Sequence, residues 1–242
     1  MNIVDSLRKW SELTPNEDAV IDWDRKVRVS FSSLLTRAEA LANGLSFLGL
    51  KKGDRVAVLS TNRSEYFEVY FACAIAGFIA QPINWRLAAE EISRIIDDGA
   101  PKVLVCEDQF LDVRAKIKTK IASSLIGLEI GSGSNGSYEA LLNKTNRADQ
   151  AYEVDAHDPV LILYTGGTTG LSKGALHSHH SLYLGMLNQT VAERIVPTDV
   201  YMLTGQMFHI PVALAMNYLA HGCPCVLINF EAKKALKAIE QE

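Results

Sequence analysis

The chain has 242 residues, of which 48% are hydrophobic and 21% are charged, and its formal net charge is −4. That length allows one large domain or two smaller ones, and the slightly acidic balance argues against a nucleic-acid or anionic-lipid partner. The start, MNIVDSLRKWSELT, lacks the apolar region of a secretory signal. The longest apolar stretch, at 70–80, is shorter than the ~20 residues of a membrane helix. We therefore expect a cytoplasmic protein without a membrane span.

Helices and strands alternate in the first half of the chain. Between residues 30 and 50, apolar residues recur at spacings of four and three, which predicts an amphipathic helix. The segments that follow are predicted, in order, as a strand at 55–60, a helix at 64–77, a strand at 78–83, a helix at 87–99 and a strand at 102–106. Strands with few polar residues that alternate with helices indicate a parallel sheet covered on both faces.

A break in composition, GSGSNGS, follows the possible strand IGLEI and precedes SYEALLNK. Gly131, Gly133 and Gly136 match the G-x-G-x-x-G pattern of dinucleotide-binding folds, and Asp155 lies at the right distance for a ribose contact. Against a cofactor site, the predicted helix is only about two turns long and AYEVDAHDP has little β character. Serine and asparagine between the glycines favour a surface turn. A nicotinamide- or flavin-dependent oxidoreductase built on these glycines remains the alternative enzyme.

The segment PVLILYTGGTTGLSKGAL, at 159–176, begins as an apolar strand and changes abruptly at Thr165. The glycines that follow, Gly166, Gly167 and Gly170, can adopt positive φ, so that successive backbone N–H groups turn to one side and form an anion site. The hydroxyls of Thr168 and Thr169 add donors, and Lys173 adds a positive charge. This chemistry suits a triphosphate. The plainer alternative is a turn between two strands. A Walker A loop is excluded because Gly170 and Lys173 are not adjacent.

The alternation continues after this loop. The predicted elements are a helix at 179–195, a strand at 200–204, a helix at 211–222, a strand at 224–230 and a helix at 231–242. The fold class is therefore α/β, with mostly parallel sheets flanked by helices.

The four cysteines are too few and too scattered for a disulfide framework. Cys223 and Cys225 form Cys-Pro-Cys, with His177, His179 and His180 upstream, so a zinc site was considered. The usual Cys-x-x-Cys spacing is missing and the histidines open a helical stretch, which argues against metal binding.

At YTGGTTGLSKG the sequence resembles the adenylate-forming superfamily, which includes acyl- and aryl-CoA synthetases, luciferases and peptide-synthetase adenylation domains. Their phosphate loop has the form Y-T-S-G-T-T-G-x-P-K-G, and here Gly166 replaces the serine and Ser172 the proline. The stretch 55–105, including the turn 82–87, resembles the front subdomain of acyl-CoA synthetases, and KGALHSHHSL resembles their K-G-x-x-x-[ST]-H-x-x-L. QMFHIP resembles P-[LM]-F-H-x-x-G more loosely, with Gln206 for the proline and Val212 for the glycine.

This resemblance implies a two-step reaction that uses ATP, Mg²⁺ and coenzyme A on a fatty or aromatic carboxylic acid. The residues from Thr165 to Gly170 and Lys173 would hold the β- and γ-phosphates, and Thr165 would also offer Mg²⁺ an oxygen ligand. His209 would border the acyl and adenylate pocket. A second alternative is a non-catalytic nucleotide-binding module that kept the loop and lost the chemistry.

Family members are much longer than this chain. Their metal-binding glutamate, ribose-holding aspartate and catalytic lysine have no counterpart before Glu242, so we expect the front half of an acyl-CoA synthetase, inactive by itself. We expect a front α/β subdomain at 1–150 and a phosphate-loop-bearing segment at 151–242. We also expect the last strand, near CVLINF, to have an unpaired edge that favours self-association.

Overall fold

The computed structural model describes residues 2–131, 136–144, 152–165 and 172–242. In chain order its elements are α1 (Asp5–Leu13), β1 (Asp18–Asp22), β2 (Val27–Ser30), α2 (Phe31–Phe47), β3 (Arg55–Leu59), α3 (Glu65–Ala76), β4 (Ile79–Pro82), α4 (Ala89–Gly99), β5 (Val103–Glu107), the 3₁₀ turn η1 (Asp108–Phe110), α5 (Leu111–Lys116), β6 (Ile126–Ile130), α6 (Ser137–Lys144), β7 (Pro159–Thr165), β8 (Lys173–Ser178), α7 (His179–Glu193), β9 (Tyr201–Leu203), α8 (Pro211–Ala220), β10 (Cys225–Leu227) and α9 (Ala232–Gln241).

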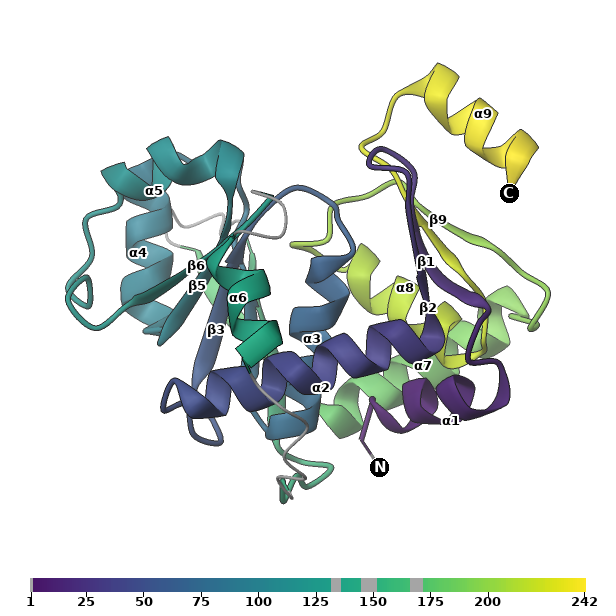
Figure 1. Ribbon diagram of the computed structural model, residues 1–242, viewed down its shortest axis with the longest axis horizontal. Helices are drawn as coiled ribbons and strands as arrows, with labels where there is room; N and C mark the ends of the chain where they lie inside the picture. Colours follow the sequence, from purple (N-terminus) through teal and green to yellow (C-terminus); the bar gives the residue numbers. More distant parts are fainter. Residues whose placement is uncertain (1, 132–135, 145–151, 166–171) are drawn as a thin grey trace.

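Within these residues the strands form two sheets. One sheet has four strands in the order β2-β1-β10-β9, and the other has six in the order β6-β5-β3-β4-β7-β8. The β1–β2 and β7–β8 pairs are antiparallel, and the remaining pairs are parallel. Figure 1 shows the sheets in two lobes, with α2 running across the base of both. The predicted class, α/β with mostly parallel sheets, is confirmed.

The six-stranded sheet is covered by helices on both faces, as its apolar strands require. In β3, Val56 and Val58 pack into the large core that includes α2 and α3. The alternate residues Ala57 and Leu59 pack on the opposite face, against a second cluster that includes α4. Side chains of a strand alternate between the two faces of the sheet. In a strand that is buried on both faces every side chain therefore faces a core, and apolar residues are favoured at all positions.

Helix boundaries follow local signals in the sequence. The Ser30 hydroxyl accepts a hydrogen bond from the Ser33 N–H and caps α2. Gly77, with φ 70°, ends α3 in the left-handed conformation that glycine adopts without strain. Ser178 caps α7 in the same way as Ser30 caps α2. These signals explain why the helices at 31–47, 65–76 and 179–193 were predictable from the sequence alone.

The strand β10 is not an edge strand, so the prediction of an unpaired edge near CVLINF is wrong. It pairs in parallel with β1 on one side and with β9 on the other. The sequence reading missed β1, whose partner is made more than 200 residues later in the chain. In the described part of this sheet the edges are β2 and β9. The expected basis for self-association is therefore absent, and self-association itself is untested.

The two predicted segments, 1–150 and 151–242, do not correspond to the two sheets. The four-stranded sheet combines β1 and β2 with β9 and β10, and the six-stranded sheet combines β3 to β6 with β7 and β8. The division therefore stays a proposal about the sequence rather than a description of the two lobes. In the described ranges, no helix is long and apolar enough to cross a membrane.

Candidate functional site

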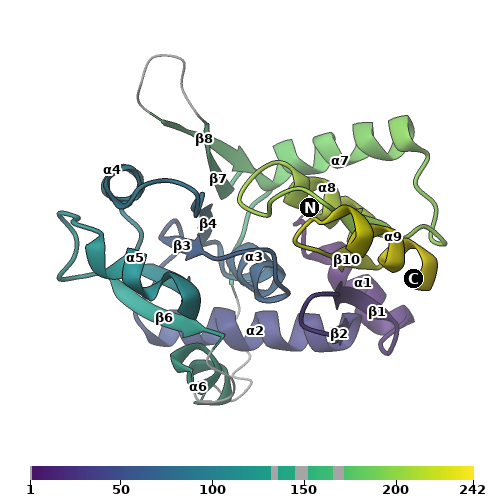
Figure 2. The same ribbon diagram turned by 90° about the horizontal axis from the view of Figure 1, so that it is seen from above.

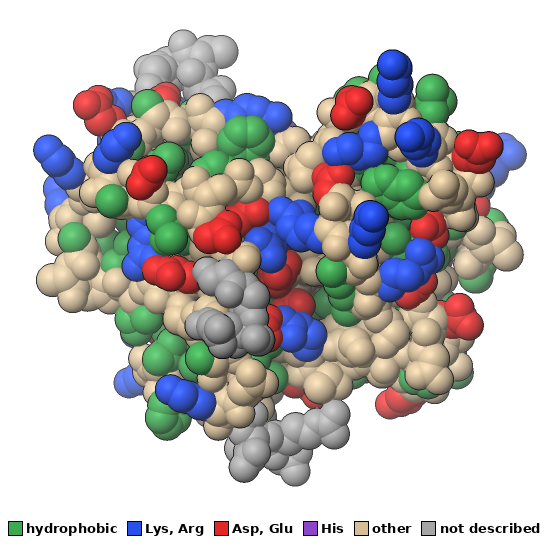
Figure 3. Space-filling view, turned by 45° about the horizontal axis from the view of Figure 1, so that its top comes forward, with side chains coloured by type: hydrophobic (Ala, Val, Ile, Leu, Met, Phe, Trp, Pro, Cys, Tyr) green, Lys and Arg blue, Asp and Glu red, His purple; other side chains and the backbone are tan. Residues whose placement is uncertain are grey.

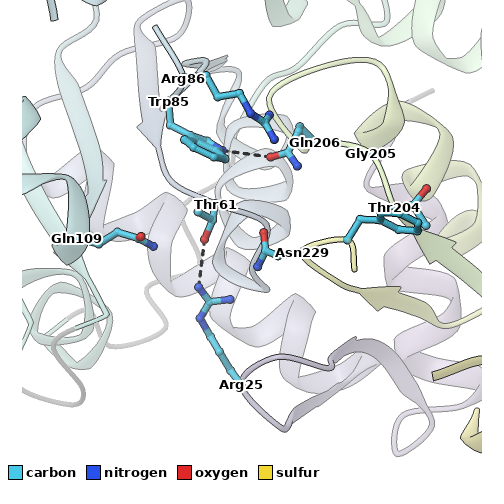
Figure 4. Close-up of a pocket in the computed structure, with 10 residues that line it drawn as sticks. Arg25, Thr61, Trp85, Arg86, Gln109, Thr204, Gly205, Gln206 and Asn229 are labelled. Carbon is cyan, nitrogen blue, oxygen red and sulfur yellow. Dashed lines mark hydrogen bonds between the residues drawn. The ribbon is translucent and has the colours of Figure 1, made fainter. Parts of the chain in front are cut away.

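A cavity of about 800 Å³ lies between the two sheets. Its lining residues share one feature, because nearly all of them follow the carboxyl end of a parallel strand. They are Arg25 after β1, Thr61 after β3, Trp85 and Arg86 after β4, Gln109 after β5, Thr204, Gly205 and Gln206 after β9, and Asn229 and Phe230 after β10. Figure 4 shows them converging from both lobes. Open α/β sheets bind ligands in a crevice outside these strand ends.

Glu107 connects the two lobes at this cavity. Its side chain is 3% exposed, and its Oε2 accepts hydrogen bonds from the Thr61 N–H (2.8 Å) and from the Ser60 and Thr61 hydroxyls (2.9 Å each). Its Oε1 accepts a hydrogen bond from Arg25 (2.8 Å) and lies 3.4 Å from Arg63 Nη1. Since Arg25 belongs to the four-stranded sheet and Glu107 to the six-stranded sheet, this ion pair fixes the sheets relative to each other.

Two further carboxylates complete the charged cluster. Asp22 forms an ion pair with Arg25 (3.3 Å), and Glu65 forms one with Arg63 (2.6 Å). Burial raises the pKa of Asp22 despite Arg25. Burial also opposes ionisation of Glu107, but its hydrogen bonds outweigh burial and hold the pKa below its usual range. Figure 3 shows charged side chains of both signs along the furrow between the lobes.

One wall of the cavity is built around Trp85. Its indole N–H donates to Gln206 Oε1 (3.1 Å), which joins the loop after β4 to the loop after β9 (Figure 4). One ring face stacks on Phe110, with centroids 5.7 Å apart, and the Arg86 guanidinium lies 4.3 Å from the ring centroid. Packing and a cation–π contact therefore immobilise this side chain, which fixes the shape of the wall.

The ends of the predicted phosphate loop lie on the β7–β8 hairpin, at the margin of the molecule in Figure 2. Thr165 and Lys173 are register partners, both are exposed, and the Thr165 hydroxyl lies 3.5 Å from the Lys173 carbonyl. A Cβ on Gly174 would lie 2.6 Å from Ile162 Cδ1, so a side chain at this position would displace the end of the Ile162 side chain. Gly166, Gly167, Thr168, Thr169 and Gly170 lie outside the described residues.

His209 lies in the turn before α8 and is exposed. Its backbone N–H donates to Gln206 O (3.1 Å), and its carbonyl accepts from the Val212 N–H (3.2 Å). Earlier residues of the same loop, Gly205 and Gln206, line the cavity, whereas His209 is not among the lining residues. Thr165 and Lys173 are also absent from the lining of this cavity.

A family model described as "AMP-binding enzyme" matches residues 7–242. The chain belongs to this family. Long-chain-fatty-acid–CoA ligase FadD13 of Mycobacterium tuberculosis is 30% identical over 244 residues, which cover 100% of this chain and 48% of that protein. Indoleacetate–CoA ligase of Aromatoleum aromaticum is 31% identical over 247 residues, with the same two coverages.

A solved structure is also similar to this AMP-binding chain over its whole length. ATP-bound MatB from Rhodopseudomonas palustris has a TM-score of 0.82 and 28% identity, and the match covers 100% of this chain and 48% of that one. The chain thus spans about half the length of the relatives it matches. The resemblance to the adenylate-forming superfamily, read from the loop and its flanks, is confirmed.

The dinucleotide alternative is disfavoured by the topology of this AMP-binding chain. A dinucleotide fingerprint needs a helix that leads to a strand beside the first one. Here β6 pairs with β5, and the next strand, β7, lies on the far side of β4. Tyr138 of α6 donates to the buried carboxylate of Glu68 (2.8 Å), and Asp155 lies in a turn rather than at a strand end. Gly131 and Gly136 flank residues that the structure does not describe, among them Gly133.

The cysteines and histidines considered for zinc are dispersed in this AMP-binding chain. The thiols of Cys223 and Cys225 are buried and donate to the carbonyls of Val196 (3.2 Å) and Ala215 (3.3 Å). Burial raises the pKa of both thiols, to about 11 for Cys223, which opposes the thiolate that zinc requires. His179 is buried elsewhere, beside Ile3. Among the described residues, no acidic, histidine or cysteine group is arranged to hold a metal.

The sequence reading missed most of the cavity residues. A usable signal was present for Thr61, Trp85 and Gln109, because each follows a strand that was predicted. Thr204 and Asn229 gave no such signal, because the predicted strands 200–204 and 224–230 extend past the observed ends of β9 and β10. Polar residues just after the strands of a parallel sheet are candidates for ligand contact. Arg25 gave no such signal, since β1 itself was not predicted.

Proposed function

We propose that the chain is the nucleotide-binding front half of an ATP-dependent acid–thiol ligase, whose substrates are a fatty or aromatic carboxylic acid and coenzyme A. One observation carries the proposal. The segment between Thr165 and Lys173, rich in glycine and threonine, connects paired strand ends in a chain of the AMP-binding family. The turn alternative is correct for the flanks, which are two strands, and it does not exclude phosphate binding.

In the first step, a carboxylate oxygen attacks the α-phosphorus of ATP. The new O–P bond gives an acyl-adenylate, and the bond to the β-phosphate breaks and releases pyrophosphate. In the second step, the coenzyme A sulfur attacks the acyl carbon, the thiol proton passes to a base, and AMP leaves. Such transfers are accelerated mainly by positioning and by stabilising spread negative charge. Residues 165–170 and Lys173 would hold the phosphates that leave, and His209 would lie on the acyl side.

The bound magnesium ion would neutralise phosphate charge. The only residue proposed for it is Thr165, which supplies one neutral oxygen, and the described part of the chain contains no cluster of three or more acidic, histidine or cysteine side chains that could hold a metal. Hard cations prefer carboxylate oxygens, so this donor set alone does not fit the ion, and we derive no step through it. Of the two acid classes, the names of the relatives support both, since one acts on long-chain fatty acids and one on indoleacetate.

Lys173→Ala is expected to weaken ATP binding tenfold or more and AMP binding much less. The lysine stands at the end of the anion loop, where it would meet the terminal phosphates that AMP lacks. A charge-assisted contact contributes about 1.5–3 kcal/mol. Isothermal titration calorimetry with both nucleotides measures the difference.

Lys237→Ala is the matched control for that experiment, because it removes the same charge from an exposed position on α9. It should leave both affinities unchanged. Equal weakening of AMP and ATP by Lys173→Ala would contradict the proposed place of the lysine. Thermal protection by NADH and none by ATP would favour the oxidoreductase.

The chain by itself is expected to release little pyrophosphate with any acid. The family resemblance assigns a metal-binding glutamate, a ribose-holding aspartate and a catalytic lysine that have no counterpart in residues 1–242. Catalytic groups that act as a unit are strongly non-additive, so the loss of several leaves little beyond binding. A pyrophosphate assay with fatty and aromatic acids tests this, and rapid acid-dependent release would contradict it. If the whole protein that contains this chain binds ATP but forms no acyl-adenylate, the chain is instead the non-catalytic nucleotide-binding module.

A further inference from the structure

Asn62 lies in the loop after β3 and is 2% exposed. Its side-chain amide belongs to the six-stranded lobe, yet its partners belong to the other lobe. Nδ2 donates to the carbonyl of Gly205 (2.6 Å) and, at 3.3 Å, to that of Ile228, while Oδ1 accepts from the Met207 N–H (2.9 Å). One buried side chain thus bridges the loops that follow β3, β9 and β10.

The loop that Asn62 holds runs from β9 to α8 and includes two cavity residues, Gly205 and Gln206. Two other side chains of the six-stranded lobe also hold it. The Tyr70 hydroxyl donates to Met207 O (2.9 Å), and the Trp85 indole donates to Gln206 Oε1 (3.1 Å). Asn62 differs from both, because it bonds to the backbone on two sides of Gln206 and so fixes the direction of the chain there.

The pattern requires an amide. The position needs a donor toward two carbonyl oxygens and an acceptor toward an N–H within one planar group, and a neutral amide supplies both. Aspartate would place a carboxylate against the two carbonyls, and alanine would leave the buried Met207 N–H and Ile228 carbonyl and the half-buried Gly205 carbonyl without these bonds. A buried polar group that is left unpaired weakens the fold around it.

We propose that Asn62 is a positioning residue for the substrate side of the site, because it holds the Gly205–Met207 backbone and thereby sets where His209 faces the acyl group. The proposal rests on the proposed ligase function for its substrate. Its structural half, that Asn62 fixes the loop against the cavity wall at Trp85, stands without a ligand.

The first experiment is ¹H–¹⁵N NMR of the chain, with the Trp85 indole signal assigned through Trp85→Phe. In Asn62→Ala, the Met207 amide should exchange at least about tenfold faster and the Trp85 indole resonance should shift, while circular dichroism shows a folded protein. Asn217→Ala is the matched control. Asn217 is 1% exposed, and its amide bonds to Met186 O and Gln189 Oε1, away from the loop. A folded Asn62→Ala with Met207 and Trp85 signals like those of Asn217→Ala overturns the proposal.

Asn62→Asp provides a pH signature that a general loss of stability would not give. Near pH 7 the carboxylate cannot donate, so the Trp85 resonance should be displaced as in Asn62→Ala. Burial raises the pKa of such a carboxyl, and its protonated form regains a donor. The Trp85 signal of this variant should therefore move away from the wild-type position as rising pH ionises the carboxyl, and return as the pH falls. A Trp85 signal that matches the wild type both below and above the titration of this carboxyl would show that the donor is not needed, and would overturn the proposal.

The second experiment measures binding of palmitoyl- and benzoyl-sulfamoyladenosine, which are stable analogues of the acyl-adenylate, and of ATP. Whichever analogue the wild type binds, Asn62→Ala should weaken the affinity for it about tenfold. The same variant should weaken the affinity for ATP less than about twofold. Equal losses for analogue and ATP would overturn the substrate-side role. A wild-type chain that binds neither nucleotide would overturn the proposed function, while the NMR experiment still decides whether Asn62 positions the loop.

Discussion

Replacing Glu107 by alanine is expected to lower the free energy of unfolding by about 3–5 kcal/mol, which is the usual effect of removing one partner from a buried ion pair. The change leaves the guanidinium groups of Arg25 and Arg63 near the furrow without the carboxylate that they share. It also leaves the Thr61 N–H without its acceptor, whereas the Ser60 hydroxyl keeps the Thr61 carbonyl as an acceptor (3.0 Å). Because the cluster joins the sheets, both lobes should lose stability together. Urea unfolding followed by circular dichroism measures the change.

Glu129→Ala is the matched control for Glu107→Ala. Glu129 lies on the neighbouring strand, in register with Cys106, and its ion pair with Arg114 is partly exposed, at 3.2 Å. Exposed pairs contribute at most about 1 kcal/mol, so this variant should unfold close to the wild type. Equal unfolding midpoints for the two variants would contradict the role given to Glu107. Glu107→Gln, which keeps the shape and loses the charge, should fall between them.

The stability of the chain is expected to fall as pH decreases from about 6.5 to about 4, in part through His179. This side chain is fully buried, its Nδ1 accepts a hydrogen bond from the Ile3 N–H (3.3 Å), and its Nε2 has no partner in the part of the chain that the structure describes. Burial lowers its pKa from 6.5 to about 4, against the opposing attraction of Asp158. Between these values the unfolded chain binds a proton that the folded chain excludes, so acid favours unfolding.

Over that interval the histidine should account for a loss of about 3 kcal/mol, and below about pH 4 its contribution should stop changing. His179→Asn is the appropriate comparison, because the asparagine oxygen can accept from the Ile3 N–H and does not titrate. The difference in unfolding free energy between the two proteins should shrink on acidification, measured by urea titrations at several pH values. A constant difference would show that His179 does not titrate in this way.

Much of the fold could be predicted from the spacing of apolar residues and from the residues that begin and end helices. The helices at 31–47, 65–76 and 89–99 have continuous apolar faces, and the strands between them contain few polar residues. The hairpin β1–β2 was not predicted, because Asp18, Asp22 and Arg28 give it a mixed composition. The core position of β1 depends on β10, which a local reading of the sequence cannot reveal.

The strand β8 was missed for a different reason. Its residues Lys173–Ser178 are mostly exposed, so no buried pattern marks it, and it is a strand because it pairs with β7 across the loop.

The candidate site also has one part that the local sequence predicts and one part that it does not. The residue types of 165–173 predict an anion loop, a role that stays a prediction, and the family that they indicate is confirmed. The cavity could not be read, because its walls come from strands far apart in sequence, and the ion pair of Arg25 with Glu107 has no local signature.

The parallel pairing of β1 with β10 sets a limit on how early the lobe with the four-stranded sheet can be completed during synthesis. Val20 is in register with Cys225, so roughly 200 residues must be made before β1 meets this partner. At about 5–20 residues per second, that interval lasts on the order of 10–40 s. Until then one edge of β1 is unpaired and the apolar face of the β1–β2 hairpin is uncovered, because β10 has not yet been synthesised. Completion of the four-stranded sheet is therefore a late event in the life of the nascent chain, even though its first strand is among the earliest segments to emerge.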